Sequence, residues 1–190
     1  MKEFVPSDFG PVLAAIVNGD RGRALDGGHP NHAVKSALEA TTVASAFAHS
    51  TVVDHGMATC CLAGAWLVHD FLDESHRNSQ GVETSSGSYW HGVMHRREGD
   101  FSNAKYWFRR VGPHEVLDEL GPNVIALAAK ESSESLADRI APGGQFDPYA
   151  MVDACQAAIG EGGEAEAFCR GVQQAEWELL FTHCYRRAIK

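Results

Sequence analysis

Apolar residues recur at three- and four-residue spacing along most of the chain, and no segment shows a sustained alternation of apolar and polar positions. The first spacing places apolar side chains on one face of a helix, whereas strands require the second. β-Branched residues are also sparse. The pattern predicts an all-α fold, a single domain spanning residues 1–190 and built as a bundle of about six to eight helices.

Four long segments are expected to form the main layer of this bundle: 31–49, 57–77, 89–98 and 164–189. The second of them is rich in Ala, Gly and Cys, and such small side chains let a neighbouring helix approach closely. The last begins with acidic and ends with basic residues, the charge order that the helix dipole favours.

Turn and capping residues divide the remainder into shorter helices. Gly99 ends the helix over 89–98, and Asp100 or Ser102 then caps a second helix that runs to residue 110. Gly121 and Pro122 are expected to interrupt the chain between two short helices. The other predicted short elements are helices over 9–17, 113–120, 123–130, 132–140 and 147–159, and a surface loop over 78–88.

The net charge of −9 argues against nucleic-acid binding, because that function needs a broad basic surface. One stretch departs from this balance: residues 96–110 contain five Lys or Arg against two acidic residues. Such a cationic patch could attract a small anionic ligand, or it could be a solvated helix face. The pattern predicts no oligomeric state.

The five cysteines form no C-x-x-C motif, and their odd number does not suggest a disulfide framework. No secretory signal is recognisable at the start of the chain. The most apolar window, 57–68, is well short of the roughly 20 residues that cross a bilayer. We therefore expect a cytoplasmic protein that does not span a membrane.

The helix predicted over 89–98 carries a possible ligand set. His91, His95 and Glu98 fall on one face, because residues four and seven apart lie close around a helix axis. Two imidazoles and a carboxylate could bind one divalent metal ion, Zn²⁺, Mn²⁺ or Fe²⁺, or perform acid–base catalysis. Zinc peptidases share this histidine spacing but have Glu where Gly92 stands, so peptidase activity is not inferred. The histidines could instead form hydrogen bonds to buried polar groups.

Further titratable residues could join this set. His69, Asp73 and His76 also share one face of a predicted helix, and would meet His91 and His95 if the two helices are antiparallel neighbours. Because they lie off the strongest apolar stripe, a solvated edge is the favoured alternative. The last helix offers Glu176 and His183, seven residues apart. No Glu-x-x-His motif occurs, so a ferritin-like di-iron site fits poorly, and no nucleophile motif supports covalent catalysis.

The same part of the chain supplies candidate ligand-binding residues with aromatic, basic or amide side chains: Trp90, Arg97, Asn103, Lys105, Trp107 and Arg109. The first hypothesis is that they orient a small polar or anionic ligand beside the histidines. The alternative is a non-catalytic small-molecule or protein interaction module, in which Arg96, Arg97 and Arg109 of a cationic–aromatic patch matter more than the histidines. The aromatic residues could also simply belong to the core.

The run over 89–98, Tyr-Trp-His-Gly-Val-Met-His-Arg-Arg-Glu, is followed by Asp100, Asn103, Lys105, Tyr106, Trp107 and Arg109. It resembles a family of uncharacterised hypothetical proteins from bacteria and fungi. A looser similarity extends to residues 146–148 and 177–180. The resemblance implies that this run is the signature of the chain, and it implies no particular reaction.

Overall fold

The computed structural model describes residues 3–131 and 133–189 and confirms the all-α class. These ranges contain eleven α-helices, more than the six to eight predicted, and one isolated β-bridge between Val52 and Ile189. The helices are α1 (Gly10–Val17), α2 (Lys35–Ala40), α3 (Val43–Ala46), α4 (His55–Leu67), α5 (Leu72–Gln80), α6 (Ser85–Glu98), α7 (Phe101–Val111), α8 (Glu115–Glu131), α9 (Glu134–Ile140), α10 (Pro148–Ala158) and α11 (Gly163–Ala188), with short 3₁₀ turns η1 (Pro6–Phe9), η2 (His32–Val34) and η3 (Pro142–Gly144).

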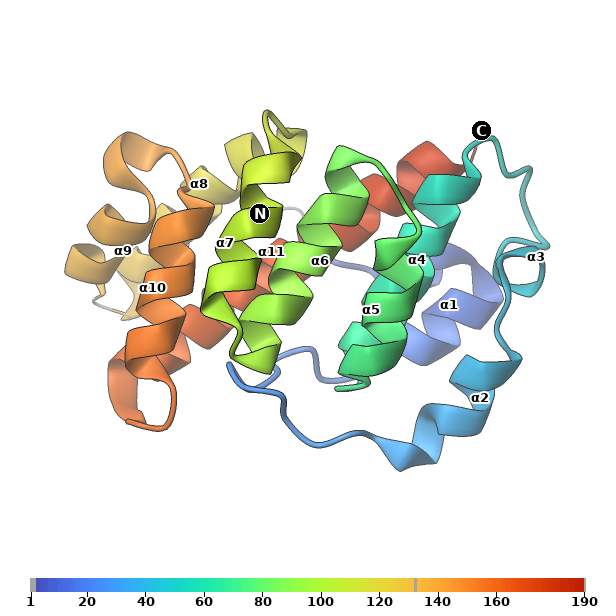
Figure 1. Cartoon of the computed structure of the whole chain (residues 1–190), viewed down its shortest axis with the longest axis horizontal. Coiled ribbons are helices and arrows are strands. Elements are labelled where there is room, and N and C mark those ends of the chain that lie inside the picture. Colours follow the sequence, from blue (N-terminus) through green and yellow to red (C-terminus); the bar gives the residue numbers. More distant parts are fainter. Residues whose placement is uncertain (1–2, 132, 190) are drawn as a thin grey trace.

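The long helix α11 runs behind α10, α7, α6 and α4, which stand side by side across the molecule (Figure 1). Its buried side chains enter two apolar clusters, one with α4 and α6 and the other with α8, α9 and α10. Trp177 of α11 stacks on Phe181 and donates an indole hydrogen bond of 3.0 Å to the carbonyl of Gly64 in α4. The predicted helix over 164–189 is thus confirmed, and its side chains enter both apolar clusters.

The long helix predicted over 31–49 is wrong. The chain forms η2, α2 and α3 there, with a break at Thr41 and Thr42. Thr42 is extended, and it forms a reciprocal capping box with Ser45 that starts α3. Local side-chain hydrogen bonds therefore outweigh the apolar spacing.

The single helix predicted over 57–77 is also wrong, because α4 ends at Leu67 and α5 begins at Leu72. Between them Asp70 has a φ of +62°, which is unfavourable for a residue other than glycine. Its carboxylate accepts hydrogen bonds of 2.7 Å from Arg97 and 3.2 Å from the backbone N–H of His29. These tertiary contacts hold the turn, which allows α5 to fold back beside α4.

The loop expected over 78–88 is shorter than predicted, since only residues 81–84 separate α5 from α6. Thr84 caps α6 by accepting a hydrogen bond of 3.1 Å from Gly87 N–H. A Cβ atom at Gly87 would lie 2.1 Å from the carbonyl oxygen of Val82, so only glycine fits there. The short connection makes α5 and α6 neighbours of opposite direction (Figure 1).

The turn between α6 and α7 follows the prediction. Gly99 ends α6 with a φ of +87°, and Asp100 accepts a hydrogen bond of 3.0 Å from Asn103 N–H to cap α7. Helix α6 starts earlier than expected, at Ser85. A Cβ atom at Gly92 would lie 3.1 Å from the ring of Phe108, so the missing side chain at position 92 lets α7 pack closely against α6.

The break expected at Gly121 and Pro122 does not occur, because α8 continues through both residues. The proline costs one backbone hydrogen bond, while Leu120 and Val124 on either side are buried in the core and hold the helix in place. The start predicted for the following helix, Ser132, lies outside the described residues, and α9 begins at Glu134. The helix predicted over 147–159 is confirmed as α10, capped by Asp147.

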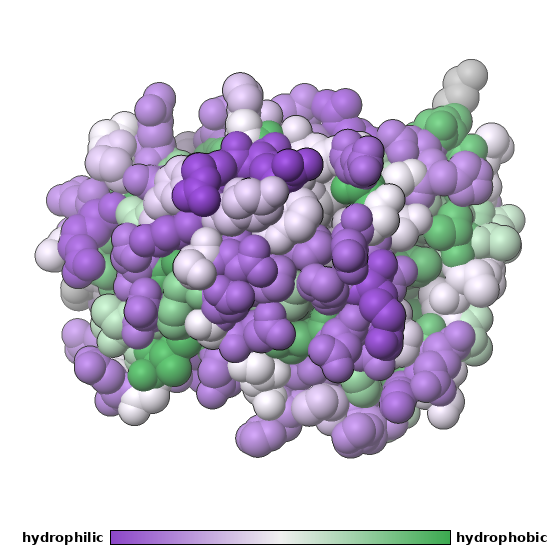
Figure 2. All heavy atoms as spheres, in the orientation of Figure 1, coloured by the Kyte–Doolittle hydropathy of each residue, from purple (hydrophilic) through white to green (hydrophobic). Residues whose placement is uncertain are grey.

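Polar residues cover most of the face shown in Figure 2, with smaller apolar areas between them. Within the described residues, none of the helices combines the length and the apolar character needed to span a bilayer. All five cysteines are buried and free.

Candidate metal centre

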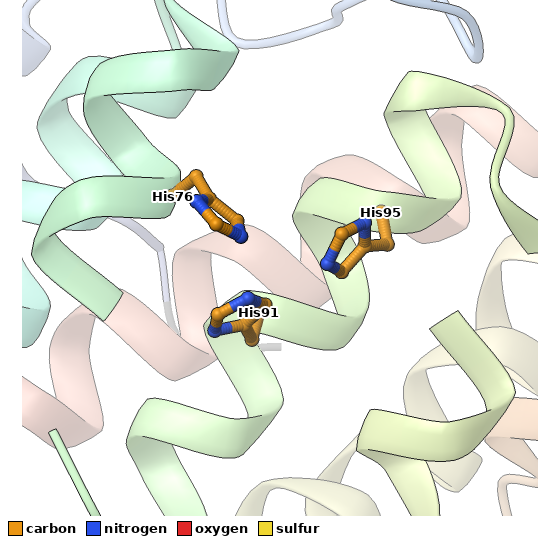
Figure 3. A group of neighbouring side chains, drawn as sticks. All are labelled: His76, His91 and His95. Atoms are coloured by element: carbon orange, nitrogen blue, oxygen red, sulfur yellow. The ribbon is translucent and has the colours of Figure 1, made fainter. Parts of the chain in front are cut away.

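Three histidines meet between α5 and α6 (Figure 3). His91 and His95 lie one turn apart on α6, and His76 faces them from α5. One potential ligand atom from each histidine lies within 4.8 Å of the other two. His91 and His95 are almost fully buried, while His76 is half-buried. We call these residues the histidine triad.

The spacing of the triad is slightly wider than a bound metal requires. Tetrahedral zinc holds histidine nitrogens at 2.0–2.1 Å, which places those nitrogens roughly 3.4 Å from one another. The rings would therefore close on the ion by about 1 Å, a movement within the range of side-chain rotation. His76, whose side chain is the most exposed of the three, has the most freedom to make it.

Glu98 orients the ring of His95. Its carboxylate lies 2.9 Å from His95 Nδ1, and because a carboxylate only accepts, that nitrogen must carry the proton. The lone pair is then on Nε2. Asn103 Nδ2 lies 3.2 Å from Nε2 and 3.5 Å from Nδ1, so its amide can donate a hydrogen bond to Nε2. A metal at Nε2 would take the place of this amide donor.

Two neighbours fix His91. Trp107 of α7 stacks on its ring at 3.9 Å between centroids and an interplanar angle of 16°. Ser79 of α5 lies 3.5 Å from His91 Nδ1 and donates its own proton to the carbonyl of His76, 3.2 Å away. The hydroxyl therefore presents a lone pair to Nδ1, which favours the tautomer with the free lone pair on Nε2.

Burial keeps two members of the triad neutral. It lowers the pKa of His91 to about 3, with the nearby imidazoles of His76 and His95 acting in the same direction. Burial also lowers the pKa of His95, although the hydrogen bond that the ring donates to Glu98 partly opposes this shift. Neutral imidazoles are the form that binds metal, so protons do not compete for His91 at neutral pH.

The predicted site residues separate into two groups. Glu98, Asn103 and Trp107 contact the histidines as described, although Glu98 bonds to a ring nitrogen and is not part of the convergent set. The other predicted ligand-binding residues lie elsewhere. Trp90 is fully buried against α4 and α11, and offers no surface to a ligand. Lys105 pairs with Asp153 at 2.5 Å.

Two arginines of the predicted cationic patch are buried in ion pairs, and two others are exposed. Arg96 is fully buried and pairs with Glu176, whose carboxylate also accepts a hydrogen bond of 3.1 Å from Tyr89. Arg97 is 2% exposed and held by Asp70. Arg109 and Arg110 remain on the surface of α7, each about 6 Å from the ring centroid of Tyr106. The interaction-module hypothesis therefore loses two of its basic residues.

The additional histidines and carboxylates named from the sequence do not act as one set. His69 lies outside α4 and α5, and its Nε2 is 2.9 Å from the carbonyl of Ile16. Asp73 is exposed on α5, Glu176 is in the core, and His183 lies beside His114. Only His76 joins His91 and His95 among the described residues. The signal that identifies it is the short connection between two antiparallel helices, each with a histidine facing the other.

Comparisons of the chain with protein-family models, with curated proteins and with solved structures found no match. The resemblance of residues 89–109 to uncharacterised proteins stays a prediction. The chemistry of the triad is therefore argued from its geometry.

Proposed function

We propose that the protein binds one divalent transition-metal ion through His76, His91 and His95, and that the ion presents an open coordination position to a small polar or anionic ligand. The observation that carries this proposal is the convergence of three histidine ligand atoms within 4.8 Å. The other ring nitrogen of His95 is engaged by Glu98, the arrangement that commonly orients a metal-binding histidine.

Metal binding explains the burial of the triad better than acid–base catalysis does. A general acid or base works best when its pKa is near the working pH. Burial instead moves the pKa of His91 to about 3, far from neutrality. A permanently neutral imidazole is a poor proton donor but a good metal ligand.

The donor set favours zinc among the three candidate ions. Imidazole nitrogen suits zinc, whereas manganese prefers oxygen ligands and non-haem iron sites typically combine two histidines with a carboxylate. Among the described residues no Asp, Glu or Cys joins the three histidines as a fourth donor. Three protein ligands with an open fourth position are typical of catalytic rather than structural zinc sites.

The charge of such a centre defines the ligand class. Three neutral histidines leave the full charge of the ion uncompensated, so the open position would favour an anion or a polarisable oxygen. Glu98 and Asp100 lie close enough to raise the pKa of His95 electrostatically, and they would stabilise the bound cation. Trp107 and Asn103 would form the walls beside the ion.

The experiment is a binding titration on protein expressed without a histidine tag. We expect the chelator-treated protein to bind one Zn²⁺ per chain by calorimetry, and Co²⁺ to give the intense visible bands of tetrahedral coordination. Adding azide as an anionic probe should shift these bands, because it enters the open position. His55→Ala, at an exposed histidine of α4, is the matched control and should behave as wild type.

Equal Zn²⁺ binding by wild type and a folded His91→Ala/His95→Ala double variant would refute the metal proposal. Cobalt spectra that azide leaves unchanged would retain the metal but contradict the open position.

A further inference from the structure

A second ligand site is indicated at the opposite side of the C-terminal helix from α4. A cavity of about 420 Å³ lies between the N-terminal segment 3–9, the start of α8 and the C-terminal half of α11. Its volume is within the range of small-molecule pockets, and it shares no residue with the histidine triad. We propose that this cavity binds a small organic amine with an apolar body, a function separate from metal binding.

The inner wall of the cavity is aromatic and rigid. Phe9 lies between Phe4 and Tyr185, with ring centroids 4.8 Å and 5.1 Å away respectively. Phe9 and Tyr185 are almost fully buried, while Phe4 is half-buried and borders the open space. Leu179 and Ile189 add aliphatic surface. An apolar ligand body would be desolvated against this wall.

The outer wall is acidic. It contains five carboxylates and two guanidinium groups, a formal charge of −3 with His183 neutral, from Glu3, Asp8, Glu115, Glu119, Glu178, Arg186 and Arg187. Two of the carboxylates are already neutralised, Glu115 by Arg187 and Glu178 by Arg21. Among residues 3–131 and 133–189, no basic group lies within ion-pair distance of Asp8 or Glu119. These carboxylates are available to a cation.

His183 supplies a neutral acceptor beside the carboxylates. Its Nδ1 lies 3.4 Å from a carboxylate oxygen of Glu115, and a ring proton facing that carboxylate would leave the lone pair on Nε2. Burial lowers the pKa of His183, and the positive charge of Arg187 lowers it further, so the ring stays neutral. A primary ammonium group has three N–H donors and can use such an acceptor together with a carboxylate. A neutral alcohol or a carboxylate ligand cannot gain from both.

Three phenyl compounds of similar size separate the contributions of charge and shape. We expect 2-phenylethylamine to bind in calorimetry at low salt and to raise the melting temperature. We expect 2-phenylethanol to bind more weakly and phenylacetate not to bind. Raising the NaCl concentration should weaken amine binding, because the carboxylates are exposed and screened by salt.

Substitutions locate the amine within the cavity. Glu119→Gln and Asp8→Asn should each weaken 2-phenylethylamine binding by about threefold, the size expected of an exposed ion pair. Thr182→Phe should abolish binding by filling the space. Asp118→Asn is the matched control, because it removes the same charge from an exposed neighbour on α8 that does not line the cavity.

Circular dichroism must show that each variant is folded. Phenylacetate binding as tightly as the amine would overturn the proposal, as would equal losses in Asp118→Asn and Glu119→Gln. Absence of amine binding to the folded wild type would overturn it as well. His91→Ala/His95→Ala should bind the amine normally, so failure of the metal proposal and failure of this one are distinguishable.

Discussion

Two histidine clusters lie within the described part of the chain, and they differ in the groups that their ring nitrogens contact. In the triad, Nδ1 of His95 faces Glu98 and Nδ1 of His91 faces Ser79, while one ligand atom of each ring converges with His76. In the second cluster, His114 and His183 lie 4.6 Å apart between ring centroids. Burial lowers the pKa of His91 and His95 in the first cluster and of His114 and His183 in the second.

In the second cluster, both ring nitrogens of His114 are engaged in internal hydrogen bonds. His114 accepts a hydrogen bond of 3.2 Å from Val116 N–H at Nδ1, so Nε2 carries the proton and donates to Ser86 Oγ at 3.0 Å. Neither ring nitrogen is left for a metal. The comparison shows that burial and a lowered pKa do not by themselves identify a metal site. The convergence of ligand atoms from three residues does.

The largest expected difference between the clusters is in zinc affinity. Replacing His76, His91 or His95 with alanine should weaken Zn²⁺ binding by more than about 100-fold. Loss of a residue that only orients a metal ligand already lowers metal affinity by about 10–100-fold. His183→Ala, with its nitrogen facing Glu115, should stay within threefold of wild type. Competition with a chelating dye measures both. A comparable loss in His183→Ala would erase the distinction.

The carboxylates that face the two clusters provide the next contrast. Glu98→Gln should lower zinc affinity by about 10–100-fold, because the amide no longer holds the proton on His95 Nδ1 as firmly. Glu115→Gln makes the same change beside His183 and should leave zinc affinity unchanged. Calorimetric titration of both variants tests this pair. Equal affinities for Glu98→Gln and wild type would remove Glu98 from its orienting role.

The pH dependence of the unfolding free energy should show that His114 of the second cluster is held neutral. Burial, followed by the nearby His183, lowers the pKa of His114 from 6.5 to about 4. Below pH 6.5 the unfolded chain therefore binds a proton that the folded protein does not, and the contribution of this residue to the unfolding free energy falls until pH 4. Between pH 7 and pH 5 the loss is about 2 kcal/mol.

Urea unfolding of wild type and His114→Gln across this range measures the effect. The stability advantage of wild type should be greatest at pH 7 and shrink by about 2 kcal/mol at pH 5. An advantage that is constant with pH would show that His114 is not held neutral by burial.

The smallest expected effect concerns the aromatic wall of the triad. Trp107→Leu should lower the unfolding free energy by about 1 kcal/mol, because it removes the stacking on His91. Zinc affinity should fall less than tenfold, since no ligand is lost. Tyr106→Leu is the neighbouring control at a residue that is 45% exposed, and should change neither quantity. Urea unfolding and zinc titration of the two variants provide the test.

Local signals predicted part of this architecture. The turn at Gly99 and Asp100 depends on neighbouring residues only, and it forms as expected. The apolar spacing does not predict the breaks at Thr42 and Asp70, for different reasons. The first depends on a capping box that competes with apolar spacing, and the second on Arg97, which lies 27 residues further along the chain.

In the candidate site, too, some features follow from local sequence and others from tertiary contacts. His91 and His95 share a helix face, so their proximity follows from spacing alone. The partners of Trp90 and Arg97 come from other helices, and no pattern within 89–109 indicates that these residues are buried. The sequence shows a histidine at position 76, but this residue joins the triad only because α5 and α6 pack against each other.

The sequence by itself determined the helical class, the capped α6–α7 turn and the paired histidines of α6, because each of these depends on interactions within one or two turns of chain. Tertiary structure decided that His76 completes the triad, that Arg96 and Arg97 serve internal ion pairs, and that His114 is closed to metal. Their partners are distant in sequence, and burial gives each side chain its role by removing the water that would otherwise solvate it.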